Sequence, residues 1–160
     1  HEIVSKLNTP NVMEIGSRAG LMTHCLALAC ASNNGNVVTV EFDTPQEYYE
    51  TIQKLPENLQ KRIKHTDQDA LVFLKNLEDT KFDIIICGTH NNDRNVCSQI
   101  VLSHQMLNPL GQLYVIDSKY PICDIKVLEK RLKIGKLKLE EIVSDKIKGL
   151  YKIVPLNEVE

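Results

Sequence analysis

Two motifs early in this 160-residue chain place glycines and an acid at spacings that suit a bound ligand. Glu14-x-Gly16-x-x-x-Gly20 follows an apolar run, and glycines there let the backbone turn sharply and approach a ligand closely. The acid Glu41, followed by Phe42, ends the next apolar run about 25 residues later, where it could accept hydrogen bonds from both hydroxyls of a ribose. Each motif alone is also typical of an ordinary turn or a surface charge, so the indication comes from the pair.

A third motif, Gln68-Asp69-Ala70, follows a later and weaker apolar run. The carboxylate of Asp69 could accept a hydrogen bond from the amino group of an adenine. It could equally cap the helix that we expect to begin there, because aspartate is a favoured N-cap residue. The two roles can coexist, and the sequence leaves both open.

Candidate reactive groups follow the fourth and fifth apolar runs. In Cys87-Gly88-x-His90, the imidazole of His90 titrates near neutral pH and could serve as a general base. A histidine in a loop is also often structural or simply solvated. Asp117, at the end of the next run, could face a substrate, bind a metal or pair with Lys119.

Short apolar runs alternate with amphipathic stretches, and this alternation predicts the elements that position the motifs. The expected strands are Asn11–Ile15, Val37–Phe42, Arg62–Thr66, Phe82–Cys87 and Leu113–Ile116, and the expected helices are at about 19–31, 44–55, 69–77, 92–107 and 122–134. Near the end, Lys138–Val143 and Leu150–Val154 alternate like a pair of antiparallel strands.

Local signals predict two details within this pattern. Thr44 is expected to cap the second helix, with Pro45 in the first helical position and Glu47 completing a capping box. Pro109-x-Gly111 is expected to form a turn before the fifth strand.

The element order predicts an α/β fold in a single domain, residues 1–160. Five strands alternating with helices indicate a parallel sheet with helices on both faces, and the last two strands add a C-terminal antiparallel hairpin, which makes seven strands. Ligands of such sheets bind beyond the carboxyl ends of the strands. Every motif described above lies at such an end.

Composition narrows the setting. The net charge is −2 and the pI about 6.2, which does not indicate a general nucleic-acid binder. Five cysteines without CxxC spacing suggest neither a zinc site nor a disulfide framework, and they fit a reducing, cytoplasmic location. No apolar run approaches a membrane span, so no membrane partner is expected. The chain starts at His1 rather than Met, so we expect it to be part of a longer polypeptide.

With its five strand ends in this order, the chain resembles the class I S-adenosylmethionine (SAM)-dependent methyltransferases over nearly its whole length. The glycine turn is similar to the family's first motif, Glu41 to its ribose-binding acid, and Gln68-Asp69-Ala70 to its Gly-Asp-Ala. The resemblance implies a Rossmann-like sheet of seven strands and SAM as the cofactor. The SAM-binding residues that it implies are Glu14, Gly16, Ser17, Gly20, Glu41, Phe42, Gln68, Asp69, Cys87 and Gly88.

Within this class, Phe82–His90 is similar to a branch with Asp-Gly-x-His after the fourth strand. That branch includes small-molecule O-methyltransferases, some of them metal-dependent. Here Cys87 replaces the metal-binding aspartate, and a thiol is a poor ligand for magnesium, so we expect no metal. The resemblance implies methyl transfer to an oxygen or another heteroatom of a small molecule, with His90 as the base and Asp117 as the second candidate.

Two departures exclude other acceptors within the class. The chain has no Asn-Pro-Pro-Tyr after the fourth strand, which argues against methylation of adenine or glutamine amino groups. It also has no Pro-Cys nucleophile in that loop, which argues against methylation of cytosine at carbon 5.

Three alternatives remain open on the sequence. A nicotinamide-binding fold shares the glycine turn and the acid, but its GxGxxG fingerprint is absent, with Arg18 and Ala19 inside the turn. A module that binds SAM or a partner without catalysis, or that dimerises, would show the same motifs. The basic face with Lys126, Lys130 and Lys133 could bind nucleic acid, although a solvated helix surface is the favoured interpretation.

Overall fold

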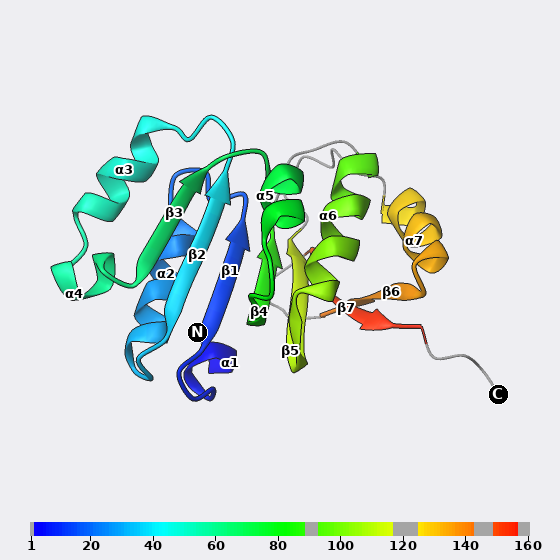
Figure 1. Ribbon diagram of the computed structural model, residues 1–160, viewed down its shortest axis with the longest axis horizontal. Helices are drawn as coiled ribbons and strands as arrows, with labels where there is room; N and C mark the ends of the chain where they lie inside the picture. The colour runs from blue at the N-terminus through cyan, green and yellow to red at the C-terminus, as the bar shows by residue number, and fades with distance from the viewer. Residues whose placement is uncertain (1, 89–92, 117–124, 143–148, 157–160) are drawn as a thin grey trace.

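A seven-stranded sheet runs through the computed structural model, which describes residues 2–88, 93–116, 125–142 and 149–156 (Figure 1). The strands are β1 (Asn11–Ile15), β2 (Asn36–Glu41), β3 (Ile63–Asp67), β4 (Phe82–Cys87), β5 (Leu107–Ile116), β6 (Leu137–Glu141) and β7 (Leu150–Pro155). Their order in the sheet is β3-β2-β1-β4-β5-β7-β6. The first five are parallel, and β7 is antiparallel to both β5 and β6, which confirms the predicted fold class.

Helices cover both faces of the sheet, as predicted. They are α1 (Glu2–Ser5), α2 (Leu21–Ala31), α3 (Gln46–Gln53), α4 (Glu57–Gln60), α5 (Ala70–Asn76), α6 (Asp93–Gln105) and α7 (Ile125–Ile134). Side chains of α5, α6 and α7 share one hydrophobic core with the sheet, and those of α1 and α2 share a second core on the opposite face. Within the described ranges, none of the helices has the length and apolar character needed to cross a membrane.

The order of the strands reverses at β1: β2 and β3 follow one another on one side of it, and β4 and β5 on the other. β1 pairs with β2 on one side and with β4 on the other, and Ile15 lies level with both Val40 and Cys87. The carboxyl ends of β1, β2 and β4 therefore lie next to one another. In sheets of this kind a crevice opens at that point.

The α3 helix begins differently from the prediction. Its N-cap is Pro45, and no side chain caps its first turn. Thr44 instead places its hydroxyl 2.9 Å from Nε2 of His65 on β3. The predicted capping box is therefore wrong, because the threonine finds a partner on a neighbouring strand that the local sequence does not reveal.

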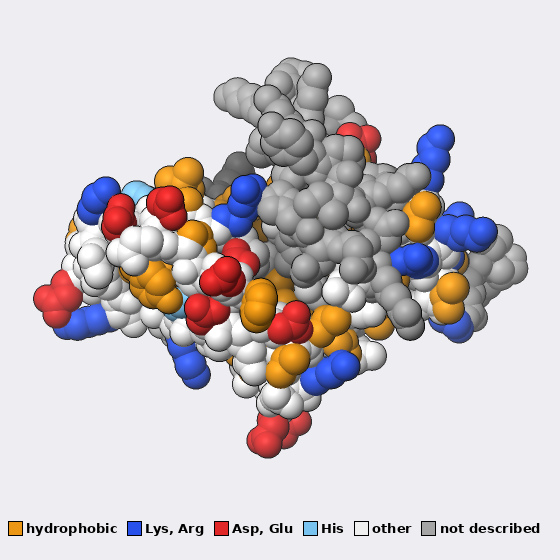
Figure 2. Space-filling model, turned by 90° about the horizontal axis from the view of Figure 1, so that it is seen from above, with side chains coloured by type: hydrophobic (Ala, Val, Ile, Leu, Met, Phe, Trp, Pro, Cys, Tyr) orange, Lys and Arg blue, Asp and Glu red, His pale blue; other side chains and the backbone are white. Residues whose placement is uncertain are grey.

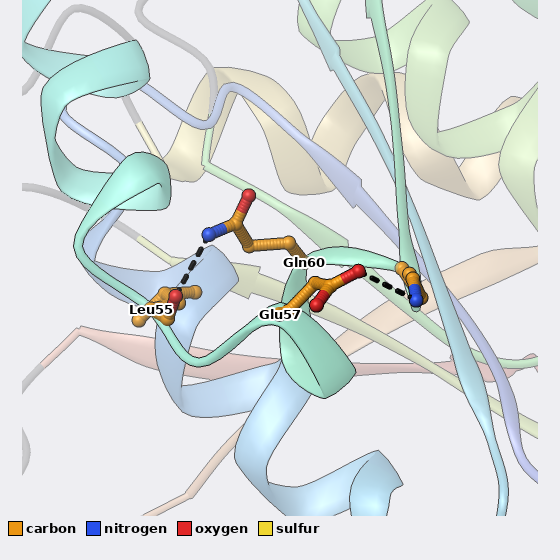
Figure 3. A network of polar contacts seen from close by, with 4 residues as sticks. Leu55, Glu57 and Gln60 are labelled. Atoms are coloured by element: carbon orange, nitrogen blue, oxygen red, sulfur yellow. Dashed lines mark hydrogen bonds and ion pairs between the residues drawn. The ribbon is translucent and has the colours of Figure 1, made fainter.

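The link from α3 to α4 is closed by short-range polar contacts (Figure 3). Gln60 donates from Nε2 to the carbonyl of Leu55 at 2.7 Å, which fastens α4 to the end of α3. Glu57 forms an ion pair with Lys61 at 2.7 Å, but both side chains are mostly exposed, so the pair contributes little to stability. The side chain of Gln60 therefore connects α4 to the end of α3, through the carbonyls of Gln53 and Leu55.

Residues 109–111 do not form a separate turn before the fifth strand, so that prediction is also wrong. They belong to β5, where the pairing with β4 shifts between Phe82 and Ile84. The carboxylate of Asp83 stabilises this irregularity by accepting the backbone N–H of Asn11 at 2.8 Å and the side-chain amide of Asn108 at 2.7 Å. Asp83 thus connects β1, β4 and β5 at the amino edge of the sheet.

Asp83→Ala should lower the free energy of unfolding by about 1–3 kcal/mol, because it leaves two hydrogen-bond donors on neighbouring strands without their acceptor. Asp79→Ala is the matched control, since Asp79 is an exposed acid just before the same strand and should change stability by less than about 0.5 kcal/mol. Urea unfolding followed by circular dichroism measures both. Equal effects of the two substitutions would contradict the role given to Asp83.

Candidate functional site

Two adjoining hollows lie at the carboxyl ends of β1, β2 and β4. The apolar hollow, about 490 Å³, is lined by Glu14, Gly16, Ser17, Arg18, Ala19, Leu21, Met22, Pro45, Ile86, Gly88 and Ile116. The acidic hollow, about 340 Å³, is lined by Ile15, Gly16, Arg18, Val40, Glu41, Phe42, Asp43, Pro45, Asp69, Ala70 and Gly88. Gly16, Arg18, Pro45 and Gly88 border both hollows, which therefore lie side by side; the two hollows together are called the crevice below.

This edge of the molecule is seen from above in Figure 2. Acidic side chains gather there beside exposed hydrophobic ones. Phe42 is 70% exposed and Leu21 is also 70% exposed, although both are large apolar side chains. Exposed apolar groups beside acids are typical of a surface that receives a ligand with both polar and apolar parts.

The two glycines of the turn between β1 and α2 have different roles. Gly16 has a φ of +87° and donates its N–H to the carbonyl of Val40 at 2.9 Å. Gly20 has a φ of +79° and lines neither hollow; a β-carbon there would lie 3.1 Å from the ring of Tyr48. Gly16 therefore shapes the crevice itself, whereas Gly20 lets α3 pack against the start of α2.

Glu14 is the buried acid of the apolar hollow. Its side chain is 2% exposed and accepts a hydrogen bond of 2.5 Å from Thr23 on α2. Burial raises the pKa of Glu14 to about 7; the bond from Thr23 lowers it in part, and the charge of Glu41 raises it further. Glu14 therefore changes its charge near neutral pH, which is typical of functional sites.

Ser17 offers a second polar group to the apolar hollow. It is 4% exposed, and its hydroxyl has no hydrogen-bond partner among the described residues. Beside it, α2 begins at Gly20 without a side-chain cap. A buried hydroxyl and uncapped helix amides next to a cavity suit a polar or anionic group of a ligand.

Of the three acids that line the acidic hollow, Glu41, Asp43 and Asp69, the first and the last have carboxylates held by backbone N–H groups at this edge. Glu41 accepts the backbone N–H groups of Arg18 at 2.8 Å and of Phe42 at 3.0 Å, which fixes it at the end of β2. Asp69 accepts the N–H groups of Leu71 at 2.9 Å and Val72 at 3.1 Å, both on Oδ1, so its predicted role as the cap of α5 is confirmed. The cap uses a single oxygen, and Asp69 also lines the hollow, so the arrangement leaves room for both predicted roles.

Gln68 contributes through its backbone. Its N–H donates to the carbonyl of Glu41 at 2.8 Å, which extends the pairing of β2 with β3 by one step. The residue is half-buried and lines neither hollow. The structure thus places Gln68 beside the crevice, where its backbone supports Glu41.

Cys87 ends β4, as the sequence predicts, but its side chain points into the core and lines neither hollow. Its side chain is 1% exposed, within the core shared with α6, and its sulfur lies 3.9 Å from the hydroxyl of Ser103. Burial raises the pKa of this thiol to about 12. Side chains alternate along a strand, so the neighbouring Ile86 points to the other face and lines the apolar hollow instead.

The two predicted reactive residues, His90 and Asp117, lie outside the described residues. The described chain stops short of them at Gly88 and Ile116, and both of these line the apolar hollow. They therefore stay predictions drawn from the sequence.

Several residues of the crevice carried no signal in the sequence analysis. Thr23 could have been noticed as a polar residue in an otherwise apolar helix, but nothing local pairs it with Glu14. Arg18 lies inside the glycine motif with a φ of +45°, and its side chain borders both hollows. Its unusual backbone conformation aims its N–H at Glu41, a role that only the folded chain reveals.

The strand order, the antiparallel β7 and the glycine turn between β1 and α2 define the class I SAM-dependent methyltransferase fold. A family model described as a methyltransferase domain matches residues 13–118, which is more than half of the chain. The chain therefore belongs to this methyltransferase family, whose members use SAM as the cofactor. No curated protein sequence matches it.

Solved structures share the fold at low sequence identity. The chain is similar to a candidate rRNA methylase from Clostridium thermocellum, with a TM-score of 0.71 and 14% identity over 99% of this chain and 94% of that one. It is also similar to the O-methyltransferase TomG of Streptomyces achromogenes, with a TM-score of 0.70 and 17% identity over 96% of this chain and 75% of that one. Mitomycin 7-O-methyltransferase MmcR matches with a TM-score of 0.65 and 12% identity over 91% of this chain, which spans 48% of that protein.

Glu14→Gln should remove a pH dependence of stability. The pKa of Glu14 rises from its ordinary value of 4.5 to about 7 on folding, so its stabilising contribution is complete below pH 4.5 and is lost as the pH rises through 7. Between about pH 5 and pH 8 the wild type should lose about 2–3 kcal/mol relative to the glutamine variant. Urea unfolding at both pH values measures this difference. Glu50→Gln, at an exposed acid of α3, is the control and should keep the wild-type pH dependence, whereas the same dependence in Glu14→Gln would contradict the buried acid.

Proposed function

We propose that this chain binds SAM along the crevice and transfers its methyl group to an oxygen or another heteroatom of a small organic molecule. The observation that carries the proposal is the pair of adjoining hollows. One holds the buried acid Glu14 and the Ser17 hydroxyl, which has no hydrogen-bond partner among the described residues, and the other holds Glu41 and Asp69. Membership of the methyltransferase family supports the reaction class.

The residues of the apolar hollow fit the amino-acid end of the cofactor. Ser17 and the uncapped amides at the start of α2 would hold its carboxylate, because a helix N-terminus attracts negative charge. The ionised form of Glu14 would face its ammonium group. A ligand that satisfies these groups removes the cost of leaving polar atoms buried without partners.

The residues of the acidic hollow fit the nucleoside end. Glu41 is held in place by two backbone N–H groups and would accept from the ribose hydroxyls. Asp69 caps α5 through Oδ1, so its other oxygen would accept from the adenine amino group. The exposed ring of Phe42 would pack against the base.

SAM supplies an electrophilic methyl group on a sulfonium, and the protein supplies alignment and exclusion of water. Rigid positioning of two reactants can lower a barrier by several kcal/mol. Leu21, Met22, Ile86 and Ile116 give the apolar hollow walls that suit an organic acceptor. We retain His90 as the proposed base that would take a proton from the acceptor, with Asp117 as the second candidate, and we propose a cytoplasmic location. The structure of TomG, an O-methyltransferase of tomaymycin synthesis in complex with SAM, supports an oxygen acceptor by analogy of fold.

The main test measures binding and transfer separately. Isothermal titration calorimetry with S-adenosylhomocysteine should detect binding to the wild type, and Glu41→Gln should weaken it about 10- to 100-fold, because charged hydrogen bonds to the ribose become neutral. Glu50→Gln is the control and should bind like the wild type, since Glu50 is an exposed acid of α3 and does not line either hollow. Absence of wild-type binding would refute the proposal.

Transfer is then assayed with radiolabelled SAM over small phenols, carboxylic acids and amines, with RNA as a further arm. Transfer to a small molecule supports the proposal. Transfer to RNA alone would refute the small-molecule acceptor, and binding without any transfer would indicate a module that holds SAM without catalysis.

Asp69→Asn separates the two roles of this residue. Asparagine is as good an N-cap as aspartate, so the free energy of unfolding should change by less than about 0.5 kcal/mol. Affinity for S-adenosylhomocysteine should fall about 10-fold, because the side chain loses a charged acceptor for the adenine amino group. Calorimetry and urea unfolding on the same sample measure both quantities. Unchanged affinity would show that Asp69 serves only as a helix cap.

A further inference from the structure

We propose that a groove over α5, α6 and α7, separate from the crevice, is a second binding site and takes a small amphiphilic carboxylate such as a medium-chain fatty acid. In this proposal Arg131 binds the carboxylate, and the apolar wall of the groove covers the hydrocarbon chain. The proposal is independent of the proposed function, because no residue that lines the groove also lines either hollow of the crevice.

The groove has a volume of about 770 Å³, which is larger than either hollow of the crevice and is typical of sites for small molecules. It lies over α6, which packs against both α5 and α7 and lies between them in Figure 1. Val96 and Ile100 on one face of α6 are buried, and the residues of α6 that line the groove lie on the opposite face. The last turns of α5 and α7 border it on either side.

The wall of the groove is largely apolar. Cys97 and Val101 are four residues apart on α6 and so share one face of the helix, and Leu102 lies beside them. All three are only partly buried against the core. Ile134, at the end of α7, is 86% exposed although its side chain is large and apolar. A hydrocarbon chain bound along these residues removes their surface from water, which is favourable for an apolar ligand.

Arg131 brings a positive charge into this apolar setting. Its Nη1 is buried and has no hydrogen-bond partner among the described residues, although the side chain lines the groove. A buried charged nitrogen without an acceptor is unfavourable, because it has given up water and gained nothing in return. Buried arginines are normally paired, so the missing acceptor points to a ligand.

The charges of the groove select an anion. Lys75, in the last turn of α5, also lines the groove, and the described residues that line it include no acid. A planar carboxylate matches a guanidinium, because it can accept two parallel N–H groups. Burial raises the pKa of the Cys97 thiol, and the positive charge of Arg131 opposes that effect, which places this charge beside the apolar wall. One carboxylate on a hydrocarbon chain is the ligand that satisfies both parts of the groove.

Isothermal titration calorimetry with decanoate tests the site. Decanoate should bind the wild type at one site per chain, and Arg131→Gln should weaken binding about 10- to 100-fold, because the charged hydrogen bonds to the carboxylate are lost. Decanol has the same chain without the charge and should bind at least about 10-fold more weakly than decanoate. Lys133→Gln is the matched control and should bind like the wild type, since Lys133 is an exposed cation of α7 that does not line the groove.

Ile134→Ser tests the apolar wall and leaves the core intact, because the side chain that it shortens is exposed. It should weaken decanoate binding about 3- to 10-fold, since less hydrocarbon is covered in the complex. Circular dichroism of each variant confirms that the fold is kept.

Alkylation of thiols locates the bound molecule. Decanoate should slow the reaction of Cys97 with N-ethylmaleimide, measured by mass spectrometry of peptides. Cys25 is the internal control, because it is exposed on α2, which packs on the opposite face of the sheet, and its reaction should not change.

Absence of wild-type binding, equal binding of decanol, unchanged affinity in Arg131→Gln or unprotected Cys97 overturns the proposal. Competition between decanoate and S-adenosylhomocysteine also overturns it, because the ligand would then lie in the crevice. Sedimentation velocity tests a second copy of the chain as the occupant, and dimerisation that is lost in Ile134→Ser would overturn the small-molecule site. Binding of decanoate without binding of S-adenosylhomocysteine supports this site and refutes the proposed function, whereas the reverse result refutes only this site.

Discussion

The site depends on how the backbone leaves β1. Gly16 donates its N–H to Val40 of β2, and Gly88 donates its own to Ile15 of β1, so the ends of three strands are joined at one place by backbone hydrogen bonds. A β-carbon on Gly88 would lie 3.6 Å from the carbonyl oxygen of Gly16, an ordinary contact distance, so the ends of β1 and β4 lie side by side at this crossing. The helices α1 and α2, on either side of β1 in the chain, pack on one face of the sheet, whereas α5 and α6, on either side of β4, pack on the other. The crevice opens between these two sets of helices.

This geometry also explains why polar groups are buried at the end of β1. Glu14 shares a face of the strand with Val12 and points toward α2, where Thr23 donates to it. Burial of an acid without such partners would cost several kcal/mol, and here part of that cost is expressed as a raised pKa rather than as instability. Ser17, a few residues on, is likewise buried, and its hydroxyl has no hydrogen-bond partner in the part of the chain that the structure describes. The crevice therefore offers a charged group and an unused hydrogen-bonding group within a few residues of each other.

The predictions that failed share one cause. Thr44 has the sequence of a helix cap, but its hydroxyl bonds to His65, which lies 21 positions away in the chain. Pro109 signals a turn, yet it lies within β5, where the contacts of Asp83 maintain an irregular pairing. In each case a partner distant in sequence outweighs a local preference.

The sequence by itself determined the alternation of strands and helices, the glycine turn, Glu41 and the cap at Asp69, because each rests on periodicity or on residues close together in the chain. Tertiary structure alone decided the burial of Glu14 and its hydrogen bond with Thr23. That bond joins β1 to α2, and it forms only when this helix packs beside the sheet. Burial supplies the rest, because a carboxyl changes its pKa only once the surrounding fold excludes water.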